Sequence, residues 1–149
     1  MMILQDVIKK LTDLAPEAYA QEWDNVGLLV GDRAQEISKI FIALDADETA
    51  IAQAQACGAQ LLLTHHPMIF SPLKKINTDE FISARVVKLL QAGISCYAMH
   101  TNYDAARMGT LAAERLDIPV EAPLGDLFER EGQIYGIGTI GNMREGCLL

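Results

Sequence analysis

The spacing of apolar and polar residues predicts helices and strands in the first part of the chain. Apolar residues recur at helical spacing over residues 3–14, and Pro16 ends this helix. The continuous apolar run at 39–44 is typical of a strand covered on both faces. An alanine-rich helix at 48–57 and a strand at 60–64 come next, and this compact strand–helix–strand unit favours a parallel pair of strands.

Further strands are predicted before and after this unit. A short strand is expected in the middle of residues 22–32, where Trp23 is expected to fill an edge of the core. Asn77 or Thr78 is expected to cap a helix, and a strand at 94–99 comes after it. The chain is therefore predicted to be an α/β protein whose sheet is mixed or mostly parallel and flanked by helices.

The C-terminal third has a weaker pattern. A helix is expected around 108–116, and the acidic segment 121–131 is expected to be a loop. Residues 133–141 alternate apolar and small residues, which predicts one last strand. That strand has no predicted partner, so its edge is expected to pair with another chain.

Composition narrows the class of protein. The chain has 149 residues, half of them hydrophobic, which suits one globular domain. A net charge of -8 without a basic patch makes a nucleic-acid partner unexpected. No apolar run approaches the roughly 18 residues of a membrane span, and no signal peptide is expected. Three cysteines without CxxC spacing indicate a reducing, cytoplasmic location.

Metal-binding side chains follow two of the predicted strands. His65 and His66 end the strand at 60–64, and His100 and Asp104 follow the strand at 94–99. Ligands bind at the carboxyl ends of strands in open α/β sheets, and imidazole with carboxylate is a transition-metal donor set. These four groups are predicted to converge at one edge. The alternative for each histidine is an ordinary hydrogen-bonded role at a strand end.

The local backbone bears on how many ions such a site would take. Pro67 disfavours a helical conformation for His66, and adjacent residues in an extended chain point to opposite sides. One ion is therefore not expected to take both His65 and His66, whereas two ions could take one each. Thr64, Thr101 and Asn102 are candidates to support the ligands or, alternatively, ordinary turn and capping residues. A nucleophilic cysteine is a weaker alternative, because Cys57 and Cys96 look like small buried hydrophobes.

Four stretches of the sequence carry a resemblance to known proteins: EWDNVGLLVG at 22–31, LTHHP at 63–67, HTNYD at 100–104 and YGIG at 135–138. In this order they resemble the dinuclear metal-binding family of the NGG-one-interacting-factor-three type, which includes the GTP cyclohydrolase 1 type 2 homologues. The resemblance implies two divalent metal ions (zinc, iron or manganese) held by His65, His66 and Asp104, with His100 beside them as a catalytic proton-transfer group or a ligand. It also implies a homohexameric ring and a nucleotide substrate, GTP or a relative.

The chain departs from the family pattern in one important respect. Members carry a later His-x-x-x-Glu motif, but all three histidines of this chain are already assigned. Residues 1–149 are therefore expected to be a single, incomplete domain that matches the family's N-terminal half. The resemblance implies a metal-dependent hydrolase. The alternatives are a non-catalytic metal carrier or interaction protein, and an inactive truncated fragment.

Overall fold

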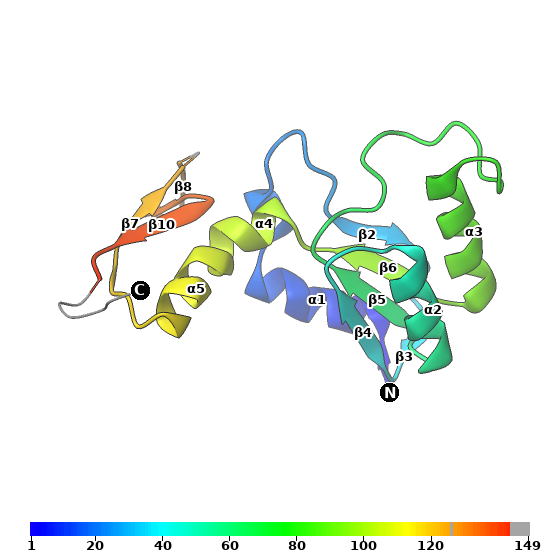
Figure 1. The fold of residues 1–149 in the computed structure, drawn as a ribbon. Helices are drawn as coiled ribbons and strands as arrows, with labels where there is room; N and C mark the ends of the chain where they lie inside the picture. The colour runs from blue at the N-terminus through cyan, green and yellow to red at the C-terminus, as the bar shows by residue number, and fades with distance from the viewer. Residues whose placement is uncertain (126, 144–149) are drawn as a thin grey trace.

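The computed structural model describes residues 1–125 and 127–143 and contains a four-stranded sheet between helical layers (Figure 1). Three strands run parallel and the fourth joins them antiparallel, so the sheet is mixed, as predicted. The order across the sheet is β2-β6-β5-β4. The strands are β2 Gly27–Val30, β4 Ile40–Ala43, β5 Leu61–Thr64 and β6 Ser95–Ala98.

Helices cover the two faces of this sheet with two separate hydrophobic clusters. Helix α1 Leu4–Leu14 packs on one face against Leu61 and Tyr97. Helices α2 Glu48–Ala56 and α3 Phe81–Ala92 pack on the other face against Leu62 and Cys96. Alternate residues of β5 and β6 therefore enter different clusters, which explains why these strands are almost wholly apolar.

Local sequence signals account for several of the observed boundaries. The side chain of Asp47 accepts a hydrogen bond from the Ala50 backbone N–H and so caps α2. Gly93 has a left-handed backbone, with φ 64°, and ends α3. Helix α3 has no side-chain cap, so the prediction of a cap at Asn77 or Thr78 was wrong. The Asn77 side chain instead accepts a hydrogen bond from the Asp79 N–H.

The predicted strand at 39–44 exists but is not covered on both faces. β4 lies at the edge of the sheet, and Ile42 is 73% exposed. The α1 layer stops short of this edge, so the apolar residues Ile40 and Leu44 are also exposed. The other short elements that precede β6 are β1 Met2–Ile3, which pairs antiparallel with β3 Glu36–Ile37, and the 3-10 turn η1 Glu17–Tyr19.

The chain after β6 forms a separate lobe, at the left of Figure 1. A helical rod leads into it and is continuous from Thr101 to Arg115. We call residues 1–103 the body and residues 104–143 the extension. The rod consists of α4 Thr101–Tyr103, the π-helical turn η2 Asp104–Met108 and α5 Gly109–Arg115. The strands of the extension are β7 Val120–Leu124, β8 Phe128–Arg130, β9 Gln133–Tyr135 and β10 Gly138–Gly141.

The extension corrects two expectations. The segment 121–131 is not a loop, because it contributes β7 and β8. The single strand expected at 133–141 is two strands, separated at Gly136 and Ile137, and β10 has a partner because it pairs antiparallel with β7. Most side chains of β7 and β8 are exposed, so these two strands lack the apolar alternation by which strands are recognised in a sequence. The last residues, 144–149, lie outside the described part.

Candidate metal centre

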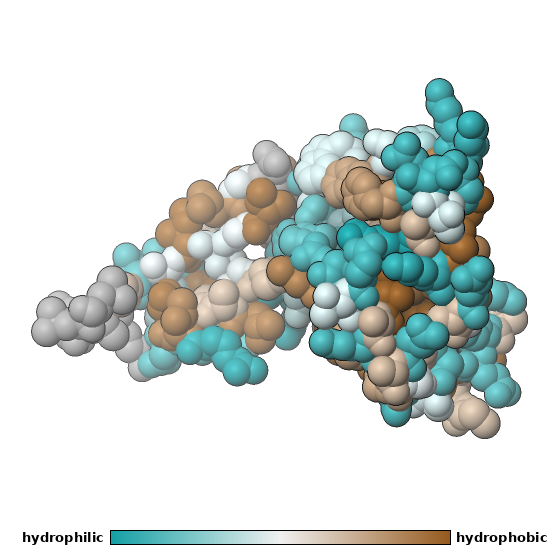
Figure 2. Space-filling view, turned by 45° about the vertical axis from the view of Figure 1, so that its right-hand side comes forward, coloured by the Kyte–Doolittle hydropathy of each residue, from teal (hydrophilic) through white to brown (hydrophobic). Residues whose placement is uncertain are grey.

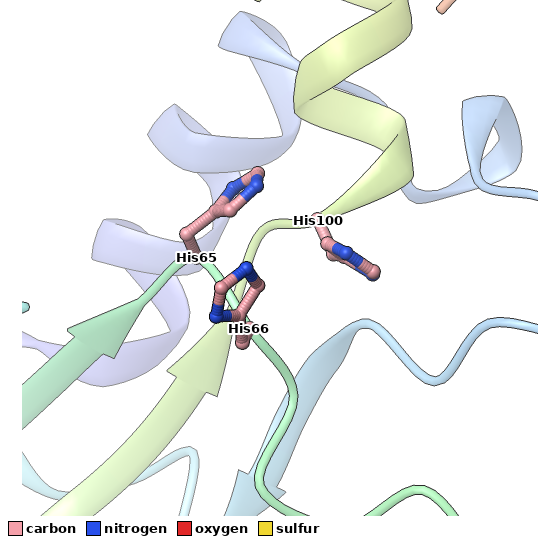
Figure 3. A group of neighbouring side chains, drawn as sticks. All are labelled: His65, His66 and His100. Atoms are coloured by element: carbon pink, nitrogen blue, oxygen red, sulfur yellow. The ribbon is translucent and has the colours of Figure 1, made fainter. Parts of the chain in front are cut away.

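Three histidine rings gather at the carboxyl ends of β5 and β6 (Figure 3). One ring nitrogen from each of His65, His66 and His100 lies within 4.8 Å of the other two. Their ring centroids are 5.0 to 5.6 Å apart. Because β5 and β6 are parallel neighbours, their carboxyl ends meet at one edge of the sheet and bring residues 35 positions apart together.

The backbone after β5 explains how His65 and His66 reach the same space. The chain bends at these two residues instead of continuing as a strand. Their N–H groups donate to the carbonyls of Ala43 and Leu44, and the Thr64 hydroxyl donates to the His66 carbonyl at 3.0 Å. The expectation that adjacent histidines point to opposite sides was therefore wrong, since it assumed an extended backbone.

Each histidine ring is held by an oxygen on its Nδ1 side. Nδ1 of His65 lies 2.9 Å from the Met99 carbonyl oxygen, and Nδ1 of His66 lies 2.8 Å from a carboxylate oxygen of Asp45. Nδ1 of His100 lies 3.1 Å from both carboxylate oxygens of Asp24. A carbonyl or carboxylate oxygen only accepts, so each Nδ1 donates its hydrogen. The tautomer that results leaves Nε2 with a free lone pair, which is the usual state of a metal-binding histidine.

Asp24 is the most firmly held of these oxygen partners. Its side chain is fully buried and also accepts hydrogen bonds from the Thr101 N–H and hydroxyl and from the Asn25 N–H. Burial alone raises the pKa of a carboxyl group, but the hydrogen bonds from Thr101 and His100 outweigh it, so the pKa of Asp24 lies below its usual value. Asp24 therefore stays ionised and fixes the orientation of His100.

Asp104 lies beside the three-histidine group at the first position of the π-helical turn. One of its carboxylate oxygens is 3.6 Å from Nε2 of His65. Burial raises the pKa of Asp104 above its usual value, and the nearby His65 and His100 oppose this only in part. π-helical turns occur frequently at functional sites, because the extra residue turns a side chain that an α-helix would place elsewhere. The four predicted groups are thus neighbours in space.

The donor set suits a divalent transition metal. Imidazole nitrogens with one carboxylate are ligands of zinc, iron and related ions. Thr64, Thr101 and Asn102 all contact the backbone or the supports of the histidines, and the side-chain oxygen of Asn102 accepts the His100 N–H at 2.9 Å. These contacts support the reading in which the three residues position the ligands.

Two supports of the histidines were not predicted from the sequence. Neither Asp45 nor Asp24 was expected at the site, although Asp24 lies within the EWDN stretch. Trp23 is 61% exposed and does not fill the core. Cys96 is buried as expected, and burial raises the pKa of its thiol to about 12, which makes it unreactive, whereas Cys57 is exposed and the expectation that it is buried was wrong.

Two hollows adjoin the site. An apolar groove of about 310 Å³ runs from His65 between α1 and the exposed edge of the sheet, and Leu14, Ile42 and Leu44 line it. A second hollow of about 330 Å³ lies beside Trp23 and is lined in part by Phe128 and Arg130. In the described residues, no helix is long and apolar enough to cross a membrane.

The fold and the site together define an α/β protein with a three-histidine cluster that could hold a metal ion. A family model confirms the resemblance noted in the sequence: residues 2–148 match the model of Duf34/NIF3 (NGG1p interacting factor 3), and the chain belongs to this family.

Curated relatives and solved structures agree with this assignment. The GTP cyclohydrolase 1 type 2 homolog of Clostridium perfringens is 42% identical over 108 residues, which are 72% of this chain and 41% of that protein. The homolog from Streptomyces coelicolor is 34% identical and covers 92% of this chain and 49% of its own length. Reduced HcgD from Methanocaldococcus jannaschii superposes with a TM-score of 0.76 at 33% identity, over 84% of this chain and 51% of that one. The chain thus spans less than half the length of these curated relatives.

Proposed function

We propose that this chain binds divalent metal ions through His65, His66 and Asp104, with His100 beside them as a further ligand or as a proton-transfer group. The observation that carries the proposal is the arrangement of the three rings, each held through Nδ1 by an oxygen while the rings face a common space. A pair of ions, as the resemblance implies, is the finer form of the proposal, in which His65 and Asp104 hold one ion and His66 holds the other.

Metal-assisted hydrolysis is the activity that this donor set supports best. A divalent ion held there lowers the pKa of a bound water and polarises a substrate oxygen. Asp24 and Asp45 orient their histidines, and His100 is positioned to exchange a proton with substrate if it is not itself a ligand. The names of the relatives suggest GTP or a related nucleotide as the substrate.

A non-catalytic metal-carrying role is the second candidate. It is favoured by the openness of part of the site, since the side chains of His66 and Asp45 are 46% and 57% exposed. An ion at such a position exchanges readily with solvent or with a partner protein.

A homo-oligomer is proposed from the resemblance, and the free thiols of Cys57 and Cys96 are consistent with a cytoplasmic location.

Metal titration of the purified chain tests the proposal. The three histidines of the cluster are all the histidines of the chain, so no other one can replace them. Zinc, iron or manganese should bind to the wild type. The double variant His65→Ala/Asp104→Ala should lose bound metal, whereas the control Asp79→Asn should keep it. Unchanged metal content in the double variant would refute the assignment.

Two further measurements refine the proposal. Asp45→Ala, which removes the support of His66, should weaken binding by about 10- to 100-fold. Metal analysis distinguishes one ion per chain from two. Incubation of the loaded chain with GTP separates the two functions: product formation that disappears in the His100→Ala variant supports a hydrolase, and stable metal binding without turnover supports the carrier.

A further inference from the structure

Two large aromatic side chains stand exposed next to the three-histidine cluster. Trp23 is 61% exposed and Phe70 is 52% exposed. Their rings stack on each other with centroids 6.0 Å apart and planes only 18° from parallel. Both rings also meet His100 edge-on, at 6.1 and 6.3 Å. The pair therefore forms one aromatic surface that begins at the candidate metal centre.

The backbone under both rings is firmly held. Trp23 directly precedes the buried Asp24, whose carboxylate accepts hydrogen bonds from Thr101 and His100. The loop that carries Phe70 is anchored by the buried Met68. Asn25 joins the two loops, since its side-chain amide donates to the Ile69 carbonyl at 2.6 Å. The aromatic pair is thus preorganised and does not depend on a mobile loop.

An exposed aromatic pair on so rigid a support suits a flat ligand. Single exposed hydrophobic residues are common and need no explanation, but here two neighbouring rings forgo the stabilisation that burial would give. A rigid aromatic face binds planar rings by stacking, independently of their hydrogen-bonding groups. The adjoining hollow is lined by both Arg130 and Glu22, so its charge does not select an anion. The group that this surface recognises is therefore the aromatic ring of the ligand.

We infer that Trp23 and Phe70 form a stacking platform for a planar heteroaromatic ring, which they hold beside His100. This inference rests on the proposed function in so far as the ring belongs to the substrate of the metal centre. It assigns the binding of the substrate's flat heterocycle to Trp23 and Phe70, and it gives these two residues no part in the chemistry.

Tryptophan fluorescence tests the platform directly, because Trp23 is the only tryptophan of the chain. Adenosine and guanosine monophosphates are titrated into the full chain, with and without metal, and ribose 5-phosphate serves as the control without a ring. Trp23 is excited at the long-wavelength edge of the tryptophan absorption band, where purines do not absorb. Saturable quenching by the purine compounds and none by ribose 5-phosphate is the expected result.

Variants of Phe70 leave the fluorescent reporter in place. Phe70→Ala should weaken purine binding by roughly tenfold or more, because a stacking contact of about 1–3 kcal/mol is lost. Phe70→Tyr should retain binding. Phe81→Ala, at an exposed phenylalanine where α3 begins, is the matched control and should have no effect. The metal content should be the same in all of these variants.

The outcomes separate this inference from the proposed function. Absence of quenching, or equal quenching by ribose 5-phosphate, overturns the platform even if metal binds normally. Loss of metal from Phe70→Ala also overturns it, because the rings would then serve only to pack His100. Purine binding by a chain that takes no metal refutes the metal proposal and leaves the platform standing.

Discussion

The body and the extension both contain helices and strands, but different interactions stabilise the two parts. All four residues of β6 in the body are buried, whereas four of the five residues of β7 in the extension are exposed. The body has hydrophobic clusters on both faces of its sheet. The strands of the extension form two-stranded ribbons, and hydrophobic side chains gather on the part of its surface visible at the left of Figure 2. Buried side chains therefore stabilise the body, whereas backbone hydrogen bonds between paired strands stabilise most of the extension.

This difference explains why the candidate metal centre lies on the body. A ligand must be held within a few tenths of an ångström, which requires that its neighbours are themselves fixed. His65 and His100 follow strands whose residues are almost all buried, and Asp24 is fully buried. Asp104 is the first residue of the extension and the one proposed ligand that the extension supplies.

The largest expected effect is the loss of unfolding free energy when a strand leucine of the body is replaced, compared with a strand leucine of the extension. Leu61 in β5 is fully buried and Leu124 in β7 is half exposed. Leu61→Ala should lower the free energy of unfolding by about 2–5 kcal/mol, because it removes buried surface and leaves a cavity. Leu124→Ala should change it by less than about 0.5 kcal/mol. Urea unfolding of both variants checks this, and equal losses would contradict the contrast between the two parts.

The predictability of the fold follows the same division. The helix at 3–14, the strand–helix–strand unit and the strand at 94–99 were predicted from the sequence because their apolar residues mark buried faces. β7 and β8 were missed because their exposed side chains carry no such pattern. Pro123 lies in β7 although proline cannot donate a backbone hydrogen bond, and it is tolerated there because both strands of a two-stranded ribbon are edge strands.

The candidate site was predictable in its members but not in its geometry. His65, His66, His100 and Asp104 were identified because they follow neighbouring strands. The bend after β5, which turns both adjacent histidines toward one space, depends on hydrogen bonds to Ala43 and Leu44 that no local pattern reveals. The supports Asp24 and Asp45 are distant in sequence from the rings they hold, so only the fold pairs them.

The next largest effect compares two asparagines. Asn102 is fully buried, and its side chain donates to the Ala15 carbonyl and accepts from the His100 N–H. Asn102→Ala leaves both buried partners unpaired and should cost about 1–3 kcal/mol of unfolding free energy, with weaker metal binding. The control Asn142→Ala removes an exposed bond to Glu121 and should be nearly neutral. Calorimetry with and without zinc measures both; a neutral Asn102→Ala would show that His100 is held without it.

A smaller effect concerns association. Leu127, Ile134 and Ile140 of the extension are exposed, and exposed apolar surface favours contact between chains. The chain should therefore sediment above the 16.3 kDa of a monomer at high concentration. Ile134→Lys should lower the average mass more than Ile42→Lys on the edge strand of the body. A clean monomer that binds no apolar dye would contradict this prediction.

The smallest expected effect is the acid sensitivity of an exposed ion pair that joins α2 to α3. Arg85 donates to Glu48 through two nitrogens, the shorter contact being 2.6 Å, and this hydrogen bonding lowers the pKa of Glu48 to about 2. A carboxyl group with a lowered pKa stabilises the folded chain above its ordinary pKa, about 4.3, and loses that contribution as the pH falls toward 2. The melting temperature of the wild type should therefore be slightly higher than that of Glu48→Gln at neutral pH. This difference in melting temperature should vanish as the pH falls from about 4.3 to about 2. In an Arg85→Gln background, the pH-dependent effect of Glu48→Gln should be clearly smaller, because the largest cause of the lowered pKa is removed. A difference that persists at pH 2, or one that grows on acidification, would show that this pair does not join the two helices.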